Sequence, residues 1–223
     1  MHAELKTPAE QDYDVVVVGG GPSGATAATD LAEMGCRVLL LERGFRIKPC
    51  GGAIPPRLVE QFRIPDEQIV ARIRSARMIS PADARVNMPV GDTYVAMVDR
   101  EHFDPFLRER AVSAGATLQL GAFRELRYLE DGRVELQYLN KDPAAKGAVC
   151  TVRARAVIGA DGARSRVAAQ CIPCASELKC VFAYHEIVEA PTDDAGADYE
   201  PTRCDVWYQG LSLIHISEPT RPA

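Results

Sequence analysis

The chain has 223 residues, 47% of them hydrophobic and 26% charged, which are ordinary values for a folded globular protein. That length is enough for one large domain or two small ones. The net charge of −5 gives no basic field, so a nucleic-acid partner is not expected. No apolar run approaches the roughly 18 residues that a membrane-spanning helix needs. Residues 1–12 are polar and lack the apolar core of a signal peptide, so they predict a disordered lead-in to a cytoplasmic protein.

The most specific pattern spans residues 14–42. An apolar strand runs into Gly19-x-Gly21-x-x-Gly24, a helix-like segment follows, and a second apolar strand ends on an acidic residue. Gly19 allows the tight turn out of the strand, Gly21 lets the backbone approach a pyrophosphate, and Gly24 lets the helix pack close to the sheet. The helix N-terminus then offers unpaired N–H groups and a partial positive charge to the phosphates. This order of elements predicts a βαβ unit that binds a dinucleotide.

Glu42 is the acidic residue that ends this unit. It lies 18 residues after Gly24, close to the spacing of about 20 that such a motif has. Its carboxylate can accept hydrogen bonds from ribose hydroxyls. Strand, turn, helix, strand and acid occur in the required order, which argues against an accidental Gly-rich turn.

The remaining elements alternate between short helices and strands. In chain order we expect a Gly- and Pro-rich loop (43–56), a short helix (56–62), strand-like runs (73–98), a helix (100–114), three strands (117–120, 123–129 and 134–139), one or two strands (149–159) and two strands of a different sheet (181–189 and 203–208). Phe103, Leu107 and Ala111 give the helix at 100–114 an apolar face at helical spacing. Asp131-Gly132 is a strong hairpin signal between the strands that flank it.

Seven cysteines are spread irregularly along the chain. Because the number is odd and no secretory signal is present, we expect reduced thiols rather than disulfides. Cys171 and Cys174 have the spacing of a redox pair or of half a metal site. Neither a second pair nor a nearby histidine completes a metal site, so we interpret them as two small, partly buried residues and expect no metal.

The last residues, 211–223, break the preceding pattern. Their sequence, LSLIHISEPTRPA, ends without completing a helix or strand. It closely resembles the peptide encoded when a sequencing adapter is translated at the end of a read. We therefore expect the native sequence to stop near Gly210, with a genuine loose tail as the alternative; sequencing the source DNA past this point separates the two.

Two segments resemble motifs of known flavoproteins. Residues 157–165, VIGADGARS, resemble the second nucleotide motif of the flavin hydroxylase superfamily, in which the Asp of the Asp-Gly pair, here Asp161-Gly162, lies near the FAD pyrophosphate. Residues 48–53, KPCGGA, resemble the Cys-Gly-Gly loop of the geranylgeranyl reductase family, which lies beside the flavin ring. Glycines allow backbone to lie against a flat ring without a Cβ clash.

Further segments resemble the same family. Residues 98–107, VDREHFDPFL, resemble its helix whose leading Arg, here Arg100, reaches the ribityl-phosphate region of the flavin. Residues 54–58 and 204–208 resemble the bacterial enzymes that reduce the geranylgeranyl tail of chlorophylls and bacteriochlorophylls. The resemblance covers about residues 12–210. Family members continue well past this point, with an aromatic-rich substrate motif and a Gly-Asp motif that contacts the FAD ribose, and this sequence has neither.

The resemblance implies an α/β fold, with a Rossmann-like FAD-binding domain built on a parallel sheet and part of an inserted β-rich substrate domain. We expect the FAD-binding domain over 13–170 with inserted strands at about 71–98, part of the substrate-domain sheet over 171–210, and a non-native tail over 211–223. The implied cofactors are FAD and NADPH. The residues expected to bind cofactor are Gly19, Gly21, Pro22, Ser23, Gly24, Glu42, Arg43, Cys50, Gly51, Gly52, Ala53, Arg100, Asp161 and Gly162.

The resemblance also implies a mechanism. By this resemblance FAD would be reduced by NADPH, and the flavin would supply a hydride to one carbon of an isolated prenyl double bond while a proton reached the other. Cys50 is the sole titratable side chain of the Cys-Gly-Gly loop that could reach the ring face, so it is the candidate catalytic residue, as proton donor or positioning group; a Cys that only packs against the flavin is the alternative. His102 is expected to face solvent, and His185 is a candidate for substrate contact. The basic run at 72–77 could meet a diphosphate or a lipid, although a solvated strand face is favoured.

Several functions remain open at this point. The favoured one is a prenyl-chain reductase of chlorophyll or bacteriochlorophyll biosynthesis. An archaeal-type reductase of geranylgeranyl ether lipids shares the Cys-Gly-Gly loop and differs in substrate, whereas a flavin aromatic hydroxylase would react with oxygen. A non-catalytic FAD-binding fragment would hold nucleotide without turnover. The expected partner is a prenylated small molecule or lipid, with peripheral contact to a photosynthetic membrane left open, and the sequence does not define the oligomeric state.

Overall fold

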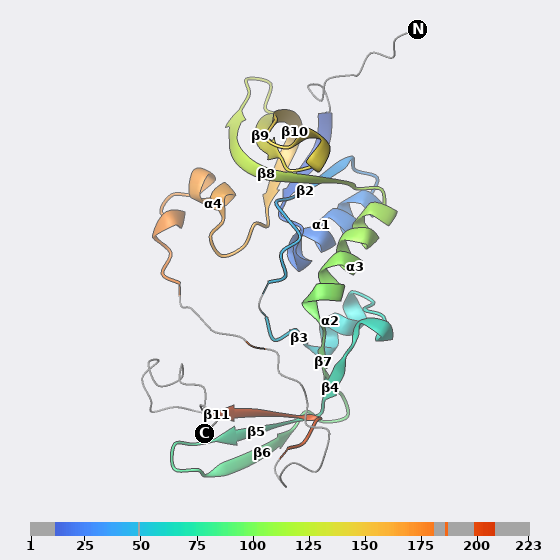
Figure 1. The fold of residues 1–223 in the computed structure, drawn as a ribbon, viewed down its shortest axis with the longest axis vertical. Coiled ribbons are helices and arrows are strands. Elements are labelled where there is room, and N and C mark those ends of the chain that lie inside the picture. The colour runs from blue at the N-terminus through green and yellow to red at the C-terminus, as the bar shows by residue number, and fades with distance from the viewer. Residues whose placement is uncertain (1–11, 49, 181–185, 187–198, 208–223) are drawn as a thin grey trace. The chain divides into compact units, whose positions relative to one another are not determined.

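The computed structural model describes residues 12–48, 50–180, 186 and 199–207 (Figure 1). The chain divides into two compact units, the first made of residues up to 47 with 104–181, and the second of 48–103 with the residues from 182 onward. Each unit is thus built from two separate segments of the chain, which alternate along the sequence. The expected lead-in before residue 12 and the expected tail at 211–223 lie outside the described residues, as does nearly all of the strand expected at 181–189.

A parallel sheet forms the base of the first unit. In it β1 (Asp12–Val18) lies between β10 (Val149–Gly159) and β2 (Val38–Glu42), and β2 pairs in turn with the start of β8 (Thr117–Tyr128). The run Val15–Val18 is continuously apolar and buried, as expected for a parallel strand that is covered on both faces. This is the βαβ arrangement that the sequence predicts.

The outer part of the same sheet is antiparallel. β9 (Val134–Asn140) pairs with both β8 and β10, so the strands close in the order β1-β10-β9-β8-β2. The hairpin predicted at Asp131-Gly132 is confirmed, and β10 is one strand. The two strands predicted at 117–120 and 123–129 are instead one bent strand, β8. A Cβ on its Gly121 would lie 2.5 Å from the Tyr138 ring, so this position has no room for a side chain.

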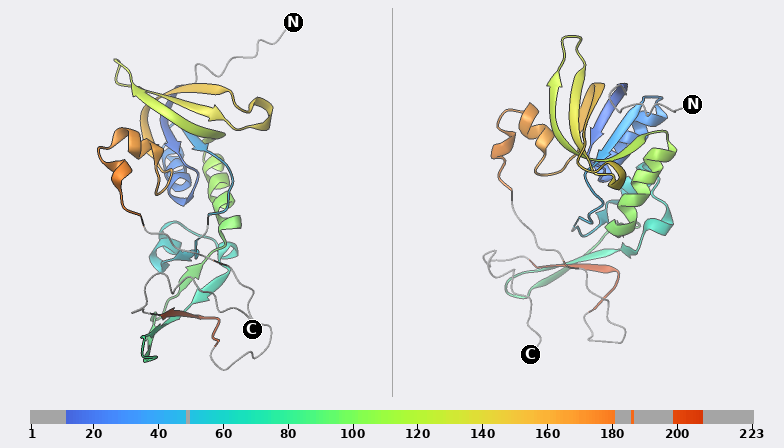
Figure 2. Two further views of the ribbon diagram at one scale, coloured as in Figure 1. Left: turned by 60° about the vertical axis from the view of Figure 1, so that its left-hand side comes forward. Right: turned by 45° about the horizontal axis from the view of Figure 1, so that its top comes forward.

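Two layers of apolar side chains cover the two faces of the parallel strands. On one face α1 (Pro22–Glu33) packs with small buried residues such as Ala25 and Ala28. On the other, Val16 and Leu39 join Leu136 in a core beneath the curved β8–β9–β10 layer. Figure 2 shows that layer on the side of the sheet away from α1. The first unit also contains most of α3 (Arg100–Ser113) and the short helix α4 (Arg166–Cys171). Two 3₁₀ turns lie at Pro143–Ala145 and Ala175–Glu177.

The second unit contains short strands in two small sheets. Its elements are β3 (Ala53–Ile54), α2 (Pro56–Gln61), a 3₁₀ turn (Asp66–Gln68), β4 (Ala71–Ile73), β5 (Ser75–Ile79), β6 (Arg85–Pro89), β7 (Val95–Met97) and β11 (Arg203–Trp207). The strand orders are β3-β7-β4 and β11-β5-β6. The strand predicted near 203–208 does belong to a different sheet from β1, and it pairs in parallel with β5.

The basic run at 72–77 does not form a uniformly solvated strand face, so that expectation is wrong for one of its members. Arg72 pairs with Asp66 at 2.9 Å, and Arg72 and Arg74 both lie over the Tyr94 ring. Arg77 is buried by the pairing with β11 and forms an ion pair with Asp205. The sequence could not reveal this, because the covering strand comes from a segment 128 residues away.

Candidate dinucleotide-binding site

The glycines of the first motif are required by close backbone contacts. Gly19 follows β1 with a φ of +108°, and a Cβ on it would lie 2.3 Å from the carbonyl oxygen of Ala160. A Cβ on Gly24 would lie 1.8 Å from the carbonyl oxygen of Gly19. Neither position can hold a side chain in this geometry. The loop between β1 and α1 is therefore as tight as the turn that the sequence predicts.

The start of α1 is chemically suited to an anion. Gly21 is its N-cap and provides no side chain to cap the helix, Pro22 is in the first turn, and no acidic residue lies there. The first amides of a helix have no intrahelical acceptor, and they carry the positive end of the helix dipole. By contrast, α4 is capped by the Ser165 hydroxyl, which accepts from the Ala168 amide at 2.9 Å. Ser23, in the first turn of α1, is exposed.

Glu42 is tied to the glycine loop by hydrogen bonds. Its Oε2 accepts from the Gly20 amide at 2.6 Å, and its Oε1 accepts from the Gly44 amide at 2.9 Å. A carboxylate has about four acceptor positions, so capacity remains for ribose hydroxyls. Arg43 follows directly and is exposed. The structure thus places the predicted acid at the glycine loop, with its orientation fixed from both sides.

The second predicted motif meets the first through its backbone. The Ala160 amide donates to the Val18 carbonyl at 2.8 Å, which brings Asp161 next to Gly19. The Asp161 carboxylate accepts from the Ser165 hydroxyl and from the Arg166 amide at 2.6 Å, so it caps the start of α4. Gly162 has a φ of +89° that suits the turn. The two motifs converge, although the Asp161 side chain is already engaged by α4.

Arg108 lies at this site, although the sequence analysis did not predict it. Arg108 of α3 is only 8% exposed, and its Nη1 donates to the Gly20 carbonyl at 3.1 Å. Its guanidinium also lies 4.8 Å from the centre of the Phe45 ring. The sequence carries a partial signal, since position 108 lies three residues before the buried Ala111 and so falls on the same side of the helix. A charged residue on a buried helix face marks a specific contact.

The Cys-Gly-Gly loop belongs to the second unit. The Cys50 side chain is exposed, and the Gly52 amide donates to its Sγ at 3.5 Å. Gly52 has a φ of +71°, and a Cβ on it would lie 2.0 Å from the Val98 carbonyl oxygen. A Cβ on Gly51 would meet nothing within 4 Å. Ala53 begins β3, which pairs with β7.

The helix predicted to start with Arg100 does start there. Asp99 accepts from the Glu101 amide at 2.9 Å and so caps α3, and Arg100 is partly buried in its first turn. His102 lies 3.3 Å from the same carboxylate and its side chain is 77% exposed, which confirms that it faces solvent. His185, the other candidate for proton transfer or substrate contact, lies outside the described residues.

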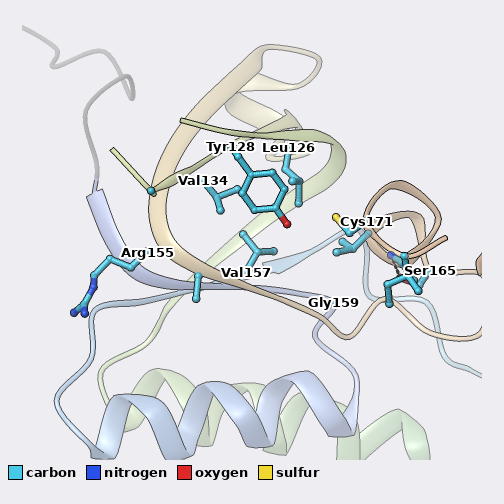
Figure 3. A pocket seen from close by; sticks show the side chains of 13 residues that line it. Leu126, Tyr128, Val134, Arg155, Val157, Gly159, Ser165 and Cys171 are labelled. Atoms are coloured by element: carbon cyan, nitrogen blue, oxygen red, sulfur yellow. Dashed lines mark hydrogen bonds between the residues drawn. The ribbon is translucent and has the colours of Figure 1, made fainter. Parts of the chain in front are cut away.

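A cavity of about 410 Å³ opens on the face of the first unit's sheet opposite α1 (Figure 3). Its lining includes Leu126 and Val134 from the antiparallel strands, Val157 from β10, and Cys171 at the end of α4. None of the residues predicted to bind cofactor lines it. Within the described part of the chain, no group of His, Cys, Asp or Glu side chains could hold a metal ion, and no helix is long and apolar enough to cross a membrane.

The glycine cradle, the uncapped start of α1 and the fixed Glu42 together fit the adenosine diphosphate part of a dinucleotide. Residues 12–180 match the FAD binding domain family, and the chain belongs to that family. The α/β, Rossmann-like fold and the FAD-binding class predicted from the sequence are thereby confirmed.

Within the FAD-binding family, the chain is similar to reductases named for geranylgeranyl substrates. The chain is similar to geranylgeranyl diphosphate reductase of Rhodobacter capsulatus, with 50% identity over 198 residues that cover 89% of the chain and 49% of the relative. It is also similar to digeranylgeranylglycerophospholipid reductase 2 of Methanopyrus kandleri, with 38% identity over 192 residues, 82% of the chain and 46% of the relative. The chain thus spans about half the length of the curated relatives it matches.

A solved structure has a similar fold. The geranylgeranyl bacteriochlorophyll reductase-like protein from Thermoplasma acidophilum matches with a TM-score of 0.69 and 22% identity, over 91% of this chain and 51% of that one. The resemblance to geranylgeranyl reductases that the sequence motifs indicate is confirmed by these relatives.

Proposed function

We propose that this chain provides the FAD-binding part of an NADPH-linked reductase that saturates double bonds of a geranylgeranyl chain, in chlorophyll or bacteriochlorophyll biosynthesis. The observation that carries the proposal is the 50% identity, over 89% of the chain, to a geranylgeranyl diphosphate reductase. The glycine loop and Glu42 support the same conclusion, because their geometry is the one expected of the dinucleotide cradle that such an oxidoreductase requires.

The residues of the first unit have the task of holding the cofactor. Bound FAD supplies hydride chemistry that no amino-acid side chain provides. The amides at the start of α1, with Ser23 beside them, would bind the diphosphate, and Glu42 would accept from the ribose hydroxyls. Arg43 would add positive charge at the same end of β2.

Cys50 is the proposed proton donor or positioning group. Its exposed Sγ accepts a hydrogen bond from the Gly52 amide at 3.5 Å. That contact would fix the direction of the sulfur and stabilise negative charge left on it after proton transfer. A Cys50→Ser variant with undiminished alkene reduction would remove the donor role, whereas loss of reduction with intact FAD binding would support it.

The first experiment is an anaerobic absorbance titration of the purified chain with FAD and then with NADPH. A bound flavin spectrum that bleaches on adding NADPH supports the proposed cofactor and reductant, and a parallel titration with NADH tests the preference between them. A protein that stays colourless after FAD is added contradicts cofactor binding by this chain. A flavin that binds but is not bleached supports the alternative of a non-catalytic FAD-binding fragment.

An archaeal-type lipid reductase is the second candidate, favoured by the 38% identity to the Methanopyrus relative. Geranylgeranyl diphosphate and a digeranylgeranylglycerophospholipid, offered separately to the reduced enzyme, distinguish the two. Faster oxidation of the flavin by the diphosphate supports the favoured function, and faster oxidation by the lipid supports the second. Oxygen-dependent hydroxylation of a phenol would contradict both.

We also propose a cytoplasmic protein in peripheral contact with a photosynthetic membrane. Prenyl chains are hydrophobic, so an enzyme that acts on them gains access at a membrane surface. Co-sedimentation of the chain with vesicles that contain a geranylgeranyl lipid, against vesicles without it, tests the contact.

A further inference from the structure

Arg108 is an unusual residue to find at the glycine loop. It is 8% exposed, and its guanidinium donates to the Gly20 carbonyl at 3.1 Å and lies 4.8 Å from the centre of the Phe45 ring. Neither partner carries a negative charge. A buried guanidinium is costly unless its charge is compensated, so its position calls for an explanation in terms of the loop it contacts.

The contact fixes one peptide group of the loop. None of the described residues is joined by a cis peptide bond, so the Gly20–Gly21 peptide is trans. In a trans peptide the C=O and N–H bonds point in opposite directions. Because the Gly20 oxygen faces Arg108, the Gly21 N–H must point away from Arg108. Within the described part of the chain, no acceptor is recorded for this N–H.

The same segment is held from its other side. The Gly20 amide donates to Glu42 at 2.6 Å. A Cβ on Gly20 would lie 3.1 Å from both the Arg108 Cδ and the Glu42 Oε2, so the two side chains flank this glycine closely. Arg108 and Glu42 therefore hold the two neighbouring peptides of Gly20, one through its carbonyl and one through its amide.

The charges around the loop also favour a role for Arg108 in binding the diphosphate. A dinucleotide diphosphate is negative, and Glu42 places a further negative charge beside the loop. The Arg108 guanidinium offsets that charge, and its charge-assisted hydrogen bond polarises the peptide so that the Gly21 N–H becomes a stronger donor.

We propose that Arg108 is a positioning residue for the cofactor: it orients the Gly20–Gly21 peptide so that the Gly21 N–H faces the diphosphate. The inference rests on the proposed binding of FAD by this chain, and it adds a residue outside both sequence motifs to the diphosphate site. Arg108 acts through the backbone and does not itself contact the cofactor.

The test compares Arg108→Leu and Arg108→Lys with a matched control, Arg110→Leu. Arg110 lies on the same helix and its guanidinium is 5.7 Å from the Phe106 ring, so the control removes an equal charge and a similar stem. In the chain labelled with ¹⁵N-glycine and free of cofactor, Arg108→Leu should shift the Gly21 amide resonance and Arg110→Leu should leave it in place. Arg108→Lys keeps a charged donor and should shift it less than Arg108→Leu.

FAD titrations and ³¹P NMR of the bound cofactor complete the test. Arg108→Leu should weaken FAD binding by about tenfold or more, as expected for loss of a hydrogen bond to a charged group, and should displace the diphosphate resonances; Arg110→Leu should do neither. Thermal unfolding of each cofactor-free variant identifies a general loss of fold, in which case the Arg108→Lys data decide.

The two failures are distinguishable. An unchanged Gly21 resonance in Arg108→Leu, or an equal change in Arg110→Leu, overturns the role of Arg108 whether or not FAD binds. A wild-type chain that binds no FAD overturns the proposed cofactor function, while the Gly21 resonance still reports whether Arg108 orients the peptide.

Discussion

The two glycine-rich loops of this chain differ in what holds them. In the Gly19–Gly24 loop, neighbouring backbone leaves no room for a side chain on either end glycine, and Glu42 and Arg108 hold the amide and the carbonyl of Gly20. In the Cys50–Gly52 loop only Gly52 is confined, by the Val98 carbonyl, while Gly51 faces open space.

The difference distinguishes a glycine that the fold requires from a glycine that only a bound group would require. In the first loop the fold itself requires glycine, so the motif is explained by the chain alone. In the second loop the fold requires one glycine of two. If Gly51 is needed, the requirement must come from something that approaches the loop, such as the flat ring that the family resemblance implies.

The largest expected effect is that of Gly24→Ala. A Cβ at this position would lie 1.8 Å from a backbone oxygen, which cannot move as a flexible side chain can. Overpacking typically costs about 1–3 kcal/mol and occasionally more; because the opposing atom belongs to the backbone, we expect at least the upper end of that range, and FAD binding to weaken by more than about tenfold. Thermal unfolding and FAD titration measure both. The matched control is Gly44→Ala, because a Cβ there meets nothing within 4 Å; equal losses in the two variants would contradict the steric argument.

Asp205→Asn tests how the second unit is stabilised. Arg203, and to a lesser degree Arg77, hold the pKa of the Asp205 carboxyl below its usual value. Because the folded pKa lies below the unfolded one, the stabilisation is present above about pH 4 and is lost as pH falls through the folded value. The substitution should lower the free energy of unfolding by about 1.5–3 kcal/mol at neutral pH.

Denaturant unfolding at pH 7 and at pH 3 measures this effect, and the difference between wild type and variant should shrink at the lower pH. Asp83→Asn is the control, because that carboxylate pairs with Arg85 at an exposed turn. A wild-type advantage over Asp205→Asn that grows on acidification would contradict the assignment.

The two glycines of the Cys50–Gly52 loop should respond differently to substitution by alanine. Gly52→Ala should lower stability by about 1–3 kcal/mol, because the residue combines a left-handed φ with a 2.0 Å approach to the Val98 oxygen. Gly51→Ala should leave the melting temperature unchanged. If the loop lies against the flavin ring, Gly51→Ala should nevertheless alter the spectrum of the bound flavin; an unaltered spectrum would leave this glycine without a cofactor role.

The smallest expected effect is that of Glu42→Gln on FAD affinity. An amide offers one acceptor atom where the carboxylate offers two, so either the Gly20 or the Gly44 amide loses its partner. We expect about tenfold weaker binding with little loss of fold. If Glu42 contacts the adenosine part of FAD, the affinity for ADP should fall in proportion. An unchanged affinity for ADP would show that Glu42 does not bind that part of the cofactor.

Features that depend on neighbouring residues in the chain were predicted from the sequence better than features that depend on distant segments. The first βαβ unit could be read directly, because Gly19, Gly21, Gly24 and Glu42 report local backbone needs at fixed spacing. The hairpin at Asp131-Gly132 was predictable for the same reason. The continuity of β8 was missed, because a glycine inside a strand suggests a break, whereas Gly121 is accommodated there by its close approach to the Tyr138 ring.

Features that depend on distant segments could not be read. Burial of Arg77 depends on β11, and the contact of Arg108 with Gly20 joins α3 to a loop 88 residues earlier. Both residues are charged, so their sequence context predicts solvent exposure unless the partner is known. Polar residues on buried faces were the clue, and only the three-dimensional arrangement identifies what they contact.

The pairing of β11 with β5 has a consequence for the order of events on the ribosome. Arg77 is synthesised 128 residues before Asp205, an interval of about 6 to 26 s at the usual rate of about 5–20 residues per second. During that time residues 104–180, which complete the described part of the first unit, are synthesised, while β5 presents an edge without the strand that later covers it. A nascent chain in this state exposes unpaired backbone groups, so slowing translation between these two positions should increase capture by chaperones and misassembly.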